Sequence, residues 1–175
     1  MLKIFFNYPS KEWHFDEIVK EAKIVRSKAN QWIKKFIKDD LIKRIKKRNK
    51  MPYYIGNFQS ANYQNKKKIF AFQFLHESGL LNHLASLEQV KTVILFGSFA
   101  RSDWYSTSDI DIFIYGNTEG LNIAKYELKL HRDIQLFIAE NKRDLQKLGN
   151  GLIKNIVKGN LIKGDLDFVK VEMNA

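Results

Sequence analysis

The sequence predicts an α+β protein in two parts, a basic helical unit that ends in a hairpin and a unit built around a small mixed β-sheet. Apolar residues recur at helical spacing through most of the first 57 residues, whereas strand-length apolar runs alternate with helical segments after residue 80. The charge also divides, because residues 1–68 hold 18 lysines and arginines against 6 acidic residues and the rest holds 12 against 13. We therefore expect domains at residues 1–57 and 80–175, joined by a linker and helix over 58–79.

The elements of the first unit follow from apolar spacing and turn residues. Residues 1–8 have the pattern of a short apolar helix, which Pro9 stops because proline disrupts helical hydrogen bonding. After it we expect a very short strand at Trp13 and Phe15, a helix from an Asp16 N-cap to about Lys23, a helix capped by Ser27, and a hairpin of residues 41–46 and 52–55. This order of elements is typical of a winged helix-turn-helix, in which the hairpin is the wing.

The helix after Ser27 carries an apolar stripe. Its apolar residues recur at intervals of three and four, which places them on one face of a helix. The residues predicted to face inward are Ala29, Trp32, Ile33, Phe36 and Ile37. The opposite, polar face is then available to a partner.

The elements of the second unit alternate between helices and strands. The polar residues 56–68 are expected to form a linker that enters a helix near Asn62 and ends near Ser78. After it we expect a helix over 80–87, strands over 91–96, 109–115 and 133–138, helices over 121–130, 142–148 and 152–158, and a closing strand near Phe168 and Val169. The first two of these strands are too close in sequence for a full helical crossover, so we expect them to pair within one mixed sheet.

The most informative pattern is Gly97-Ser98, followed after ten residues by Asp109-Ile110-Asp111, between two apolar runs. Asp109 and Asp111 stand two apart on a predicted strand, so their side chains point to the same face. Acidic groups on so apolar a strand are costly unless a cation lies between them, and Mg²⁺ prefers such oxygen ligands. Gly97 and Ser98 end one strand and open a short helix, whose backbone N–H groups can hold phosphate. Metal and phosphate together indicate nucleotide chemistry.

Asp133 opens the next predicted strand of the sheet. A helical crossover before this strand can bring its carboxylate beside Asp109 and Asp111. Three carboxylates on neighbouring strands can hold two cations, and two metal ions about 3.5–4 Å apart stabilise the attacking and leaving oxygens of a phosphoryl displacement.

These motifs resemble the nucleotidyltransferase superfamily related to DNA polymerase beta, especially its small prokaryotic members. The resemblance covers roughly residues 80–165 and includes the flanking sequences at residues 95–101 and 108–111. The first 57 residues are similar to winged-helix regulators of archaea and bacteria. The combination is similar to prokaryotic proteins in which a winged helix precedes a minimal nucleotidyltransferase domain.

The resemblance implies a catalytic role for each of the three acidic residues. Asp109, Asp111 and Asp133 would ligate Mg²⁺, with two ions expected, and Asp133 would also draw the proton from an acceptor hydroxyl. The implied reaction is attack on the α-phosphate of an NTP, with ATP expected, and release of pyrophosphate.

The resemblance also implies a nucleotide site. Gly97 would let the backbone approach the phosphates, and Ser98 would hydrogen-bond them. Arg101 and Ser108 complete the implied nucleotide-binding set. For Arg101, an ion pair with Asp103 or with Asp109 is an equal alternative.

The basic first unit predicts a polyanionic partner, with DNA expected. Polar residues of its second long helix can reach phosphates and base edges in a major groove, and basic residues of the wing can follow the phosphate backbone. The predicted DNA-binding residues are Ser27, Lys28, Asn30, Gln31 and Lys34 on the helix and Lys46, Lys47, Arg48 and Lys50 on the wing. The alternatives are a solvated lysine-rich surface and a winged helix used for dimerisation or protein docking.

Three functions fit the sequence. The first is a Mg²⁺-dependent nucleotidyltransferase whose basic unit positions a nucleic acid or protein acceptor. The second is a DNA-binding regulator whose second unit senses a nucleotide, and the third is an antitoxin that nucleotidylates a toxin partner. The chain lacks cysteine and any apolar run of roughly 18 residues, so we expect a cytoplasmic protein with no membrane partner. A homodimer is a further expectation, because winged helices often dimerise.

Overall fold

The computed structural model describes residues 1–168, and the chain divides into two compact units. The first unit comprises residues 1–70 together with the short segment Trp104–Thr107. The second comprises residues 71–103 and, of the described residues, 108–168. The first unit thus contains a piece of chain that lies, in sequence, in the middle of the second.

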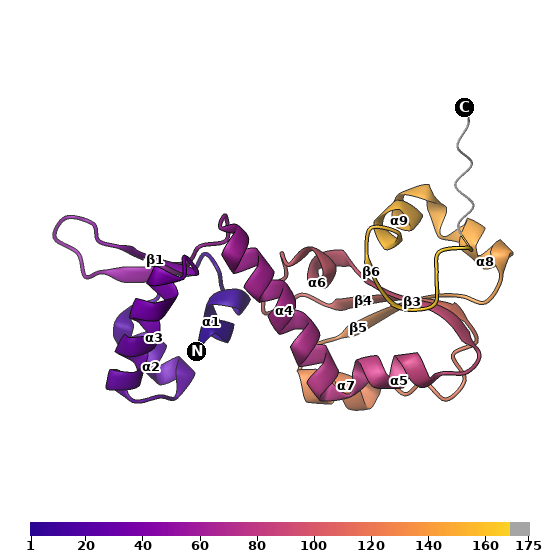
Figure 1. Ribbon diagram of the computed structural model, residues 1–175, viewed down its shortest axis with the longest axis horizontal. Coiled ribbons are helices and arrows are strands. Elements are labelled where there is room, and N and C mark those ends of the chain that lie inside the picture. The colour runs from indigo at the N-terminus through magenta and orange to yellow at the C-terminus, as the bar shows by residue number, and fades with distance from the viewer. Residues whose placement is uncertain (169–175) are drawn as a thin grey trace. The chain divides into compact units, whose positions relative to one another are not determined.

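The first unit is built from short helices and an antiparallel hairpin (Figure 1). Its elements are α1 (Leu2–Asn7), α2 (Phe15–Ala22), α3 (Arg26–Lys38), β1 (Ile42–Ile45), β2 (Tyr53–Gly56) and the first part of α4 (Ala61–Ser78). Ile18 of α2 and Ala29, Ile33 and Phe36 of α3 are buried. The helix over the first residues, the two helices that follow and the hairpin are therefore all present, and α4 begins at Ala61, beside the expected start near Asn62.

The helix starts in the first unit differ from those predicted. Trp13 forms only an isolated bridge with Tyr54, and Phe15 already belongs to α2, so the short strand is wrong. The N-cap of α2 is His14, whose backbone N–H donates to the Glu17 carboxylate at 2.8 Å, and Asp16 lies within the first turn. The N-cap of α3 is Val25 rather than Ser27. Backbone pairing around Trp13 sets where α2 begins, and local cap preference does not override it.

Two residues predicted to face inward from α3 are exposed. Trp32 is 38% exposed and Ile37 is 39% exposed. A helix that buries Ala29, Ile33 and Phe36 turns positions 32 and 37 to the borders of its apolar stripe. The Trp32 ring is tilted against Phe36, with centroids 5.5 Å apart.

The Trp104–Thr107 segment is held in the first unit by a buried lysine and by aromatic rings. Lys67 and Trp104 are each 1% exposed. The Lys67 ammonium donates to the Trp104 carbonyl at 2.5 Å and lies 4.5 Å from the centroid of its ring. Phe6 and Phe70 place their ring centroids 6.3 and 6.2 Å from the Trp104 ring. These contacts give a buried amino group both a hydrogen-bond acceptor and a π-face.

The second unit is a four-stranded mixed sheet in the order β5-β4-β3-β6. Its elements are the rest of α4, α5 (Leu80–Ser86), β3 (Val90–Phe96), α6 (Gly97–Arg101), β4 (Ile110–Gly116), α7 (Ala124–Leu130), β5 (Ile134–Ala139), α8 (Lys142–Lys147), α9 (Gly149–Ile156) and β6 (Asn160–Lys163). Strands β3 and β4 are antiparallel and β4 and β5 are parallel, which confirms the predicted mixed sheet. Helices α5 and α7 lie on one face of the sheet and α8 and α9 on the other (Figure 1).

The closing strand of the sheet is not where the sequence predicted it. Strand β6 pairs with β3 on the edge of the sheet, whereas Phe168 lies in a turn after it. Phe168 packs its ring against Phe113 and Tyr115 instead, with both centroid distances 5.3 Å. Val169 lies outside the described residues. Within residues 1–168, none of the helices has the length and apolar character that crossing a membrane requires.

Candidate active site

The turn from β3 into α6 brings Gly97 against Asp111. Phe96, the last residue of β3, pairs with Asp111 of β4, so the two motifs meet at one end of this strand pair. Gly97 has φ of +67°, and a Cβ atom on it would lie 1.9 Å from Oδ2 of Asp111. Only glycine fits here, because it adopts positive φ without strain and leaves the space that the carboxylate fills.

The carboxyl group of Asp111 is affected by burial and by two charged neighbours. Burial raises the pKa of Asp111 above its ordinary value, the negative charge of Asp109 raises it further, and the Arg101 guanidinium opposes both effects. Two acids in such a place favour either a shared proton or a bound cation. Carboxylate oxygens are also the ligands that Mg²⁺ prefers. The pair therefore fits a magnesium ion by its donor chemistry.

Asp133 occupies the corresponding position at the start of β5. Ile110 pairs with Ile134 in parallel register, and the Asp133 carbonyl accepts a hydrogen bond from the Ile110 N–H at 2.9 Å. Alternation along the two strands gives Asp133 the same face as Asp109 and Asp111. The Asp133 residue is exposed. Among residues 1–168 there is no cluster of three or more acidic or histidine side chains close enough to share a metal ion.

Arg101 is paired with a neighbouring acid. Its Nε donates to Oδ2 of Asp103 at 3.0 Å, and the two side chains are 60% and 56% exposed. Ion pairs this exposed contribute about 0–1 kcal/mol. The guanidinium can therefore leave Asp103 for a phosphate at little cost.

The loops that lead into the acidic strands are held by backbone acceptors. The Ser98 carbonyl accepts from the Asp103 N–H at 3.2 Å, which closes the turn after α6. The Ser108 carbonyl accepts from the Arg132 guanidinium at 2.8 Å. Arg132 also lies over the Phe99 ring, 5.1 Å from its centroid. Sequence reasoning missed Arg132, since only its position before Asp133 distinguishes it from other surface arginines.

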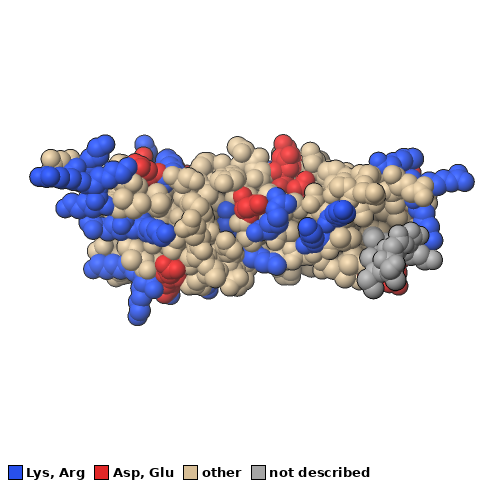
Figure 2. Space-filling view, turned by 90° about the horizontal axis from the view of Figure 1, so that it is seen from above, with Lys and Arg blue, Asp and Glu red and all other residues tan. Residues whose placement is uncertain are grey.

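The predicted DNA-binding residues all lie on the surface of the first unit. Each residue of the helix set and the wing set is exposed. Figure 2 shows lysine and arginine side chains gathered over the end of this unit that carries the β1–β2 hairpin. Lys47 lies 3.4 Å from the Glu12 carboxylate, and its pKa is raised by a hydrogen bond with Tyr53 and by the charge of Glu12.

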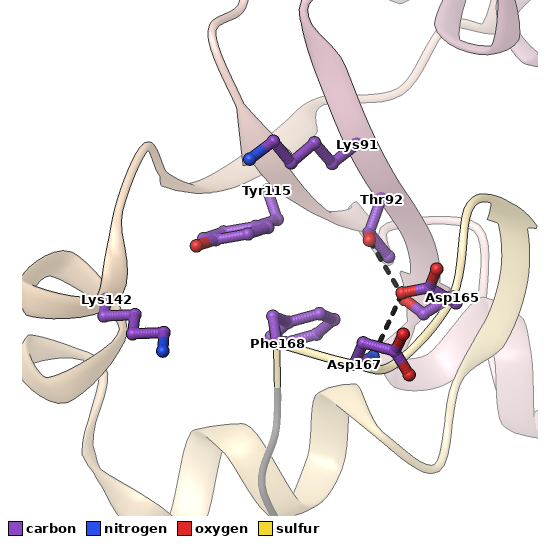
Figure 3. A pocket seen from close by; sticks show the side chains of 7 residues that line it. All are labelled: Lys91, Thr92, Tyr115, Lys142, Asp165, Asp167 and Phe168. Atoms are coloured by element: carbon purple, nitrogen blue, oxygen red, sulfur yellow. Dashed lines mark hydrogen bonds between the residues drawn. The ribbon is translucent and has the colours of Figure 1, made fainter.

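A pocket of 490 Å³ in the second unit lies away from these acids. Lys91 and Thr92 line it from the first half of β3, and Tyr115 lines it from the end of β4, whereas the two motifs meet at the opposite end of both strands. Figure 3 shows Lys91 and Lys142 on either side of the Tyr115 ring, with Phe168 below it. This pocket therefore belongs to the other end of the sheet.

Comparison with known proteins finds a family match over the second half of the chain. The family model described as "Polymerase beta, Nucleotidyltransferase" matches residues 78–165, half of the chain. A crystal structure of a candidate nucleotidyltransferase from Sulfolobus solfataricus has 20% sequence identity and a TM-score of 0.30, over 56% of this chain and 84% of that one. No curated protein matches the sequence. By the family match over half its length, this chain belongs to the polymerase beta nucleotidyltransferase family.

Proposed function

We propose that the protein is a Mg²⁺-dependent nucleotidyltransferase that transfers a nucleotidyl group from an NTP, with ATP expected, to an acceptor hydroxyl. The observation that carries this proposal is the position of Asp111. Its carboxylate lies against the backbone of Gly97, and the charge of Asp109 raises its pKa. A phosphate-accepting turn and a carboxylate pair at one end of two paired strands are the parts that phosphoryl transfer requires.

Asp109 and Asp111 would hold the metal, and Asp133 on the neighbouring strand would act on the acceptor. When bound, Mg²⁺ neutralises negative charge on the phosphates and on the oxygens that react. The raised pKa of Asp111 supports this assignment. A bound cation would offset both the cost of ionising a buried carboxyl group and the repulsion from Asp109.

The other groups bind and orient the nucleotide. Gly97 would contribute its backbone at the turn to the phosphates, with Ser98 as hydrogen-bond donor and Arg101 as counter-charge once it leaves Asp103. Ser108 completes the nucleotide-binding set, and Arg132 holds its loop in place by donating to the Ser108 carbonyl.

In the proposed reaction, the acceptor oxygen forms a bond to the α-phosphorus, and the bond from that phosphorus to the bridging oxygen of the leaving pyrophosphate breaks. The acceptor proton passes to Asp133, whose exposed position leaves it accessible to an acceptor.

The proposal is tested by incubating the protein with NTPs labelled at the α-phosphate, with Mg²⁺, and with candidate nucleic acid and protein acceptors. We expect label to move to an acceptor, pyrophosphate to appear in equal amount, and EDTA to stop both. Nucleotide binding without transfer to any acceptor would instead favour a nucleotide-sensing regulator. Label that accumulates in the nucleoside diphosphate, with release of unlabelled phosphate, would contradict nucleotidyl transfer.

We further propose that residues 1–57 form a winged helix-turn-helix that binds nucleic acid, with α3 as its recognition helix and the β1–β2 hairpin as its wing. The excess of lysine and arginine over acidic residues in the first 68 positions supports this proposal. So does the exposure of the helix set Ser27, Lys28, Asn30, Gln31 and Lys34 and the wing set Lys46, Lys47, Arg48 and Lys50.

Changing all four basic wing residues to alanine is expected to weaken binding to duplex DNA and to flatten its salt dependence. Each phosphate contact contributes a slope of about 0.9 in a plot of log affinity against log salt, so four contacts contribute about 3–4. Fluorescence anisotropy between 50 and 300 mM salt measures both effects. The charge-matched control changes Lys125, Lys142, Lys154 and Lys158 of the second unit to alanine. An equal loss in both variants would show a nonspecific charge effect and contradict the wing assignment.

A further inference from the structure

A second pocket lies within the first unit, between residues 7–11 and residues 105–107. Its volume is 360 Å³, within the roughly 300–1,000 Å³ that small-molecule sites occupy. The Ser106 N–H donates to the Asn7 carbonyl at 3.0 Å and ties the two stretches together. The buried Trp104 anchors the second stretch, so both walls of the pocket are fixed.

Exposed aromatic rings line this pocket. Tyr8 is 42% exposed and Tyr105 is 52% exposed. The Tyr8 ring meets Trp13 edge-on at 6.0 Å, which orients it. Rings presented to solvent in this way can stack on unpaired bases, and stacking tolerates every base because each has a π-face. The hydroxyl groups of Ser10, Ser106 and Thr107 add hydrogen-bonding partners for a base or a sugar.

The charge of the pocket favours an anionic ligand. Lys11 lines it, with its ammonium held 3.7 Å from the centroid of the Trp13 ring. The described residues that line the pocket include no aspartate or glutamate. A ligand that combines a flat ring with negative charge, as a nucleotide does, matches both the tyrosines and the lysine. A protein acceptor, whose reacting group is a hydroxyl side chain, would require neither the tyrosine rings nor the lysine charge.

The position of the pocket along the chain links it to the acids. Thr107 stands two residues before Asp109, so their Cα atoms are separated by at most about 7.6 Å. This limit holds because of the covalent chain alone. Only Ser108 separates Thr107 of the pocket from Asp109 along the chain.

We propose that this pocket holds the terminal nucleotide of a single-stranded nucleic acid, whose end is the acceptor of the nucleotidyl group. The inference rests on the proposed nucleotidyl transfer and names its acceptor class. Tyr8 and Tyr105 stack on the last base, and Lys11 binds the phosphate before it.

The test uses the full-length protein and short single-stranded oligonucleotides that carry 5-iodouracil either at the 3′ end or in the middle. Irradiation is expected to crosslink the terminal base to Tyr8 or Tyr105, as located by mass spectrometry, and the central base elsewhere. Tyr8→Ala and Tyr105→Ala should each lower affinity about tenfold, and the corresponding phenylalanine variants should retain it because they keep the ring. Phe58→Ala removes an equally exposed ring, 48% exposed, from the same unit and should leave affinity unchanged.

The outcomes separate this inference from the proposed function. Binding of Mg²⁺ and ATP with no oligonucleotide binding, or crosslinks that do not depend on the position of the label, would overturn the acceptor pocket alone. Transfer of label to a protein acceptor that is unaffected by either tyrosine change would also overturn it. Failure to bind both ATP and oligonucleotide would contradict the proposed function as well. Thermal melting of each variant shows whether a lost affinity reflects unfolding.

Discussion

Replacing Asp111 with asparagine is expected to lower nucleotidyl transfer by at least about a thousandfold and to stabilise the fold at neutral pH. The loss of activity follows because asparagine supplies neither the negative charge nor the second oxygen with which this residue would hold Mg²⁺. A thousandfold loss corresponds to about 4 kcal/mol of transition-state stabilisation. The gain in stability follows because the charge of Asp111 is disfavoured by burial and by Asp109.

The stability gain should depend on pH in a defined direction. The pKa of Asp111 lies above its ordinary value of 3.8 in the folded protein, so folding favours its protonated form. Ionised Asp111 therefore costs stability at neutral pH, and the cost disappears as the pH falls through the folded pKa and then below 3.8. Asparagine is uncharged at every pH, so the variant should melt above the wild type at pH 7 and together with it near pH 3.

Melting curves at several pH values and a label-transfer assay measure the two effects. Glu88→Gln, at an exposed position, is the matched control and should change neither. Mg²⁺ should raise the melting temperature of the wild type more than that of Asp111→Asn. Wild-type transfer rates in Asp111→Asn would contradict the assignment of Asp111 to the active site.

Gly97→Ala is expected to destabilise the second unit by about 2 kcal/mol or more and to reduce transfer strongly. A non-glycine residue at positive φ costs about 1–2 kcal/mol. The new Cβ would also lie 1.9 Å from the Asp111 carboxylate, so that side chain must move. The substitution therefore disturbs the turn and the acid together.

Two other glycines separate the causes of this effect. Gly149 has φ of +73° and open space where a Cβ atom would lie, so Gly149→Ala carries the backbone strain without a clash. Gly151 lies in α9 with open space and ordinary φ, and Gly151→Ala should stabilise the protein by about 0.5–1 kcal/mol. Chemical denaturation of the three variants gives the comparison. If Gly97→Ala costs no more than Gly149→Ala, contact with Asp111 is not what excludes a side chain.

Local patterns in the sequence were sufficient to predict most of the second unit. The apolar runs that flank Gly97 and Asp109 are long and bounded by turn residues, so the strands, their pairing and the short helix after Gly97 could be predicted. Because Phe96 pairs with Asp111, the approach of the glycine to the acid follows from that pairing.

The errors arose where contacts distant in sequence decide the structure. Trp13 pairs with Tyr54, some 40 residues away, and this pairing displaces the start of α2 from the position that Asp16 suggested. Trp32 fits the helical stripe by spacing, yet its neighbours leave it partly exposed. Arg132 belongs to no recognisable motif, and its hydrogen bond to the Ser108 carbonyl forms only once the sheet is folded.

The inclusion of Trp104–Thr107 in the first unit limits how this protein can evolve. If recombination joined residues from 71 onward to a foreign leading domain, the indole of Trp104 would lose Phe6, Lys67 and Phe70 and face water. Substitutions at these four positions are therefore expected to accompany one another among descendants of the same gene. The two units are therefore expected to be inherited together, although each contains its own sheet.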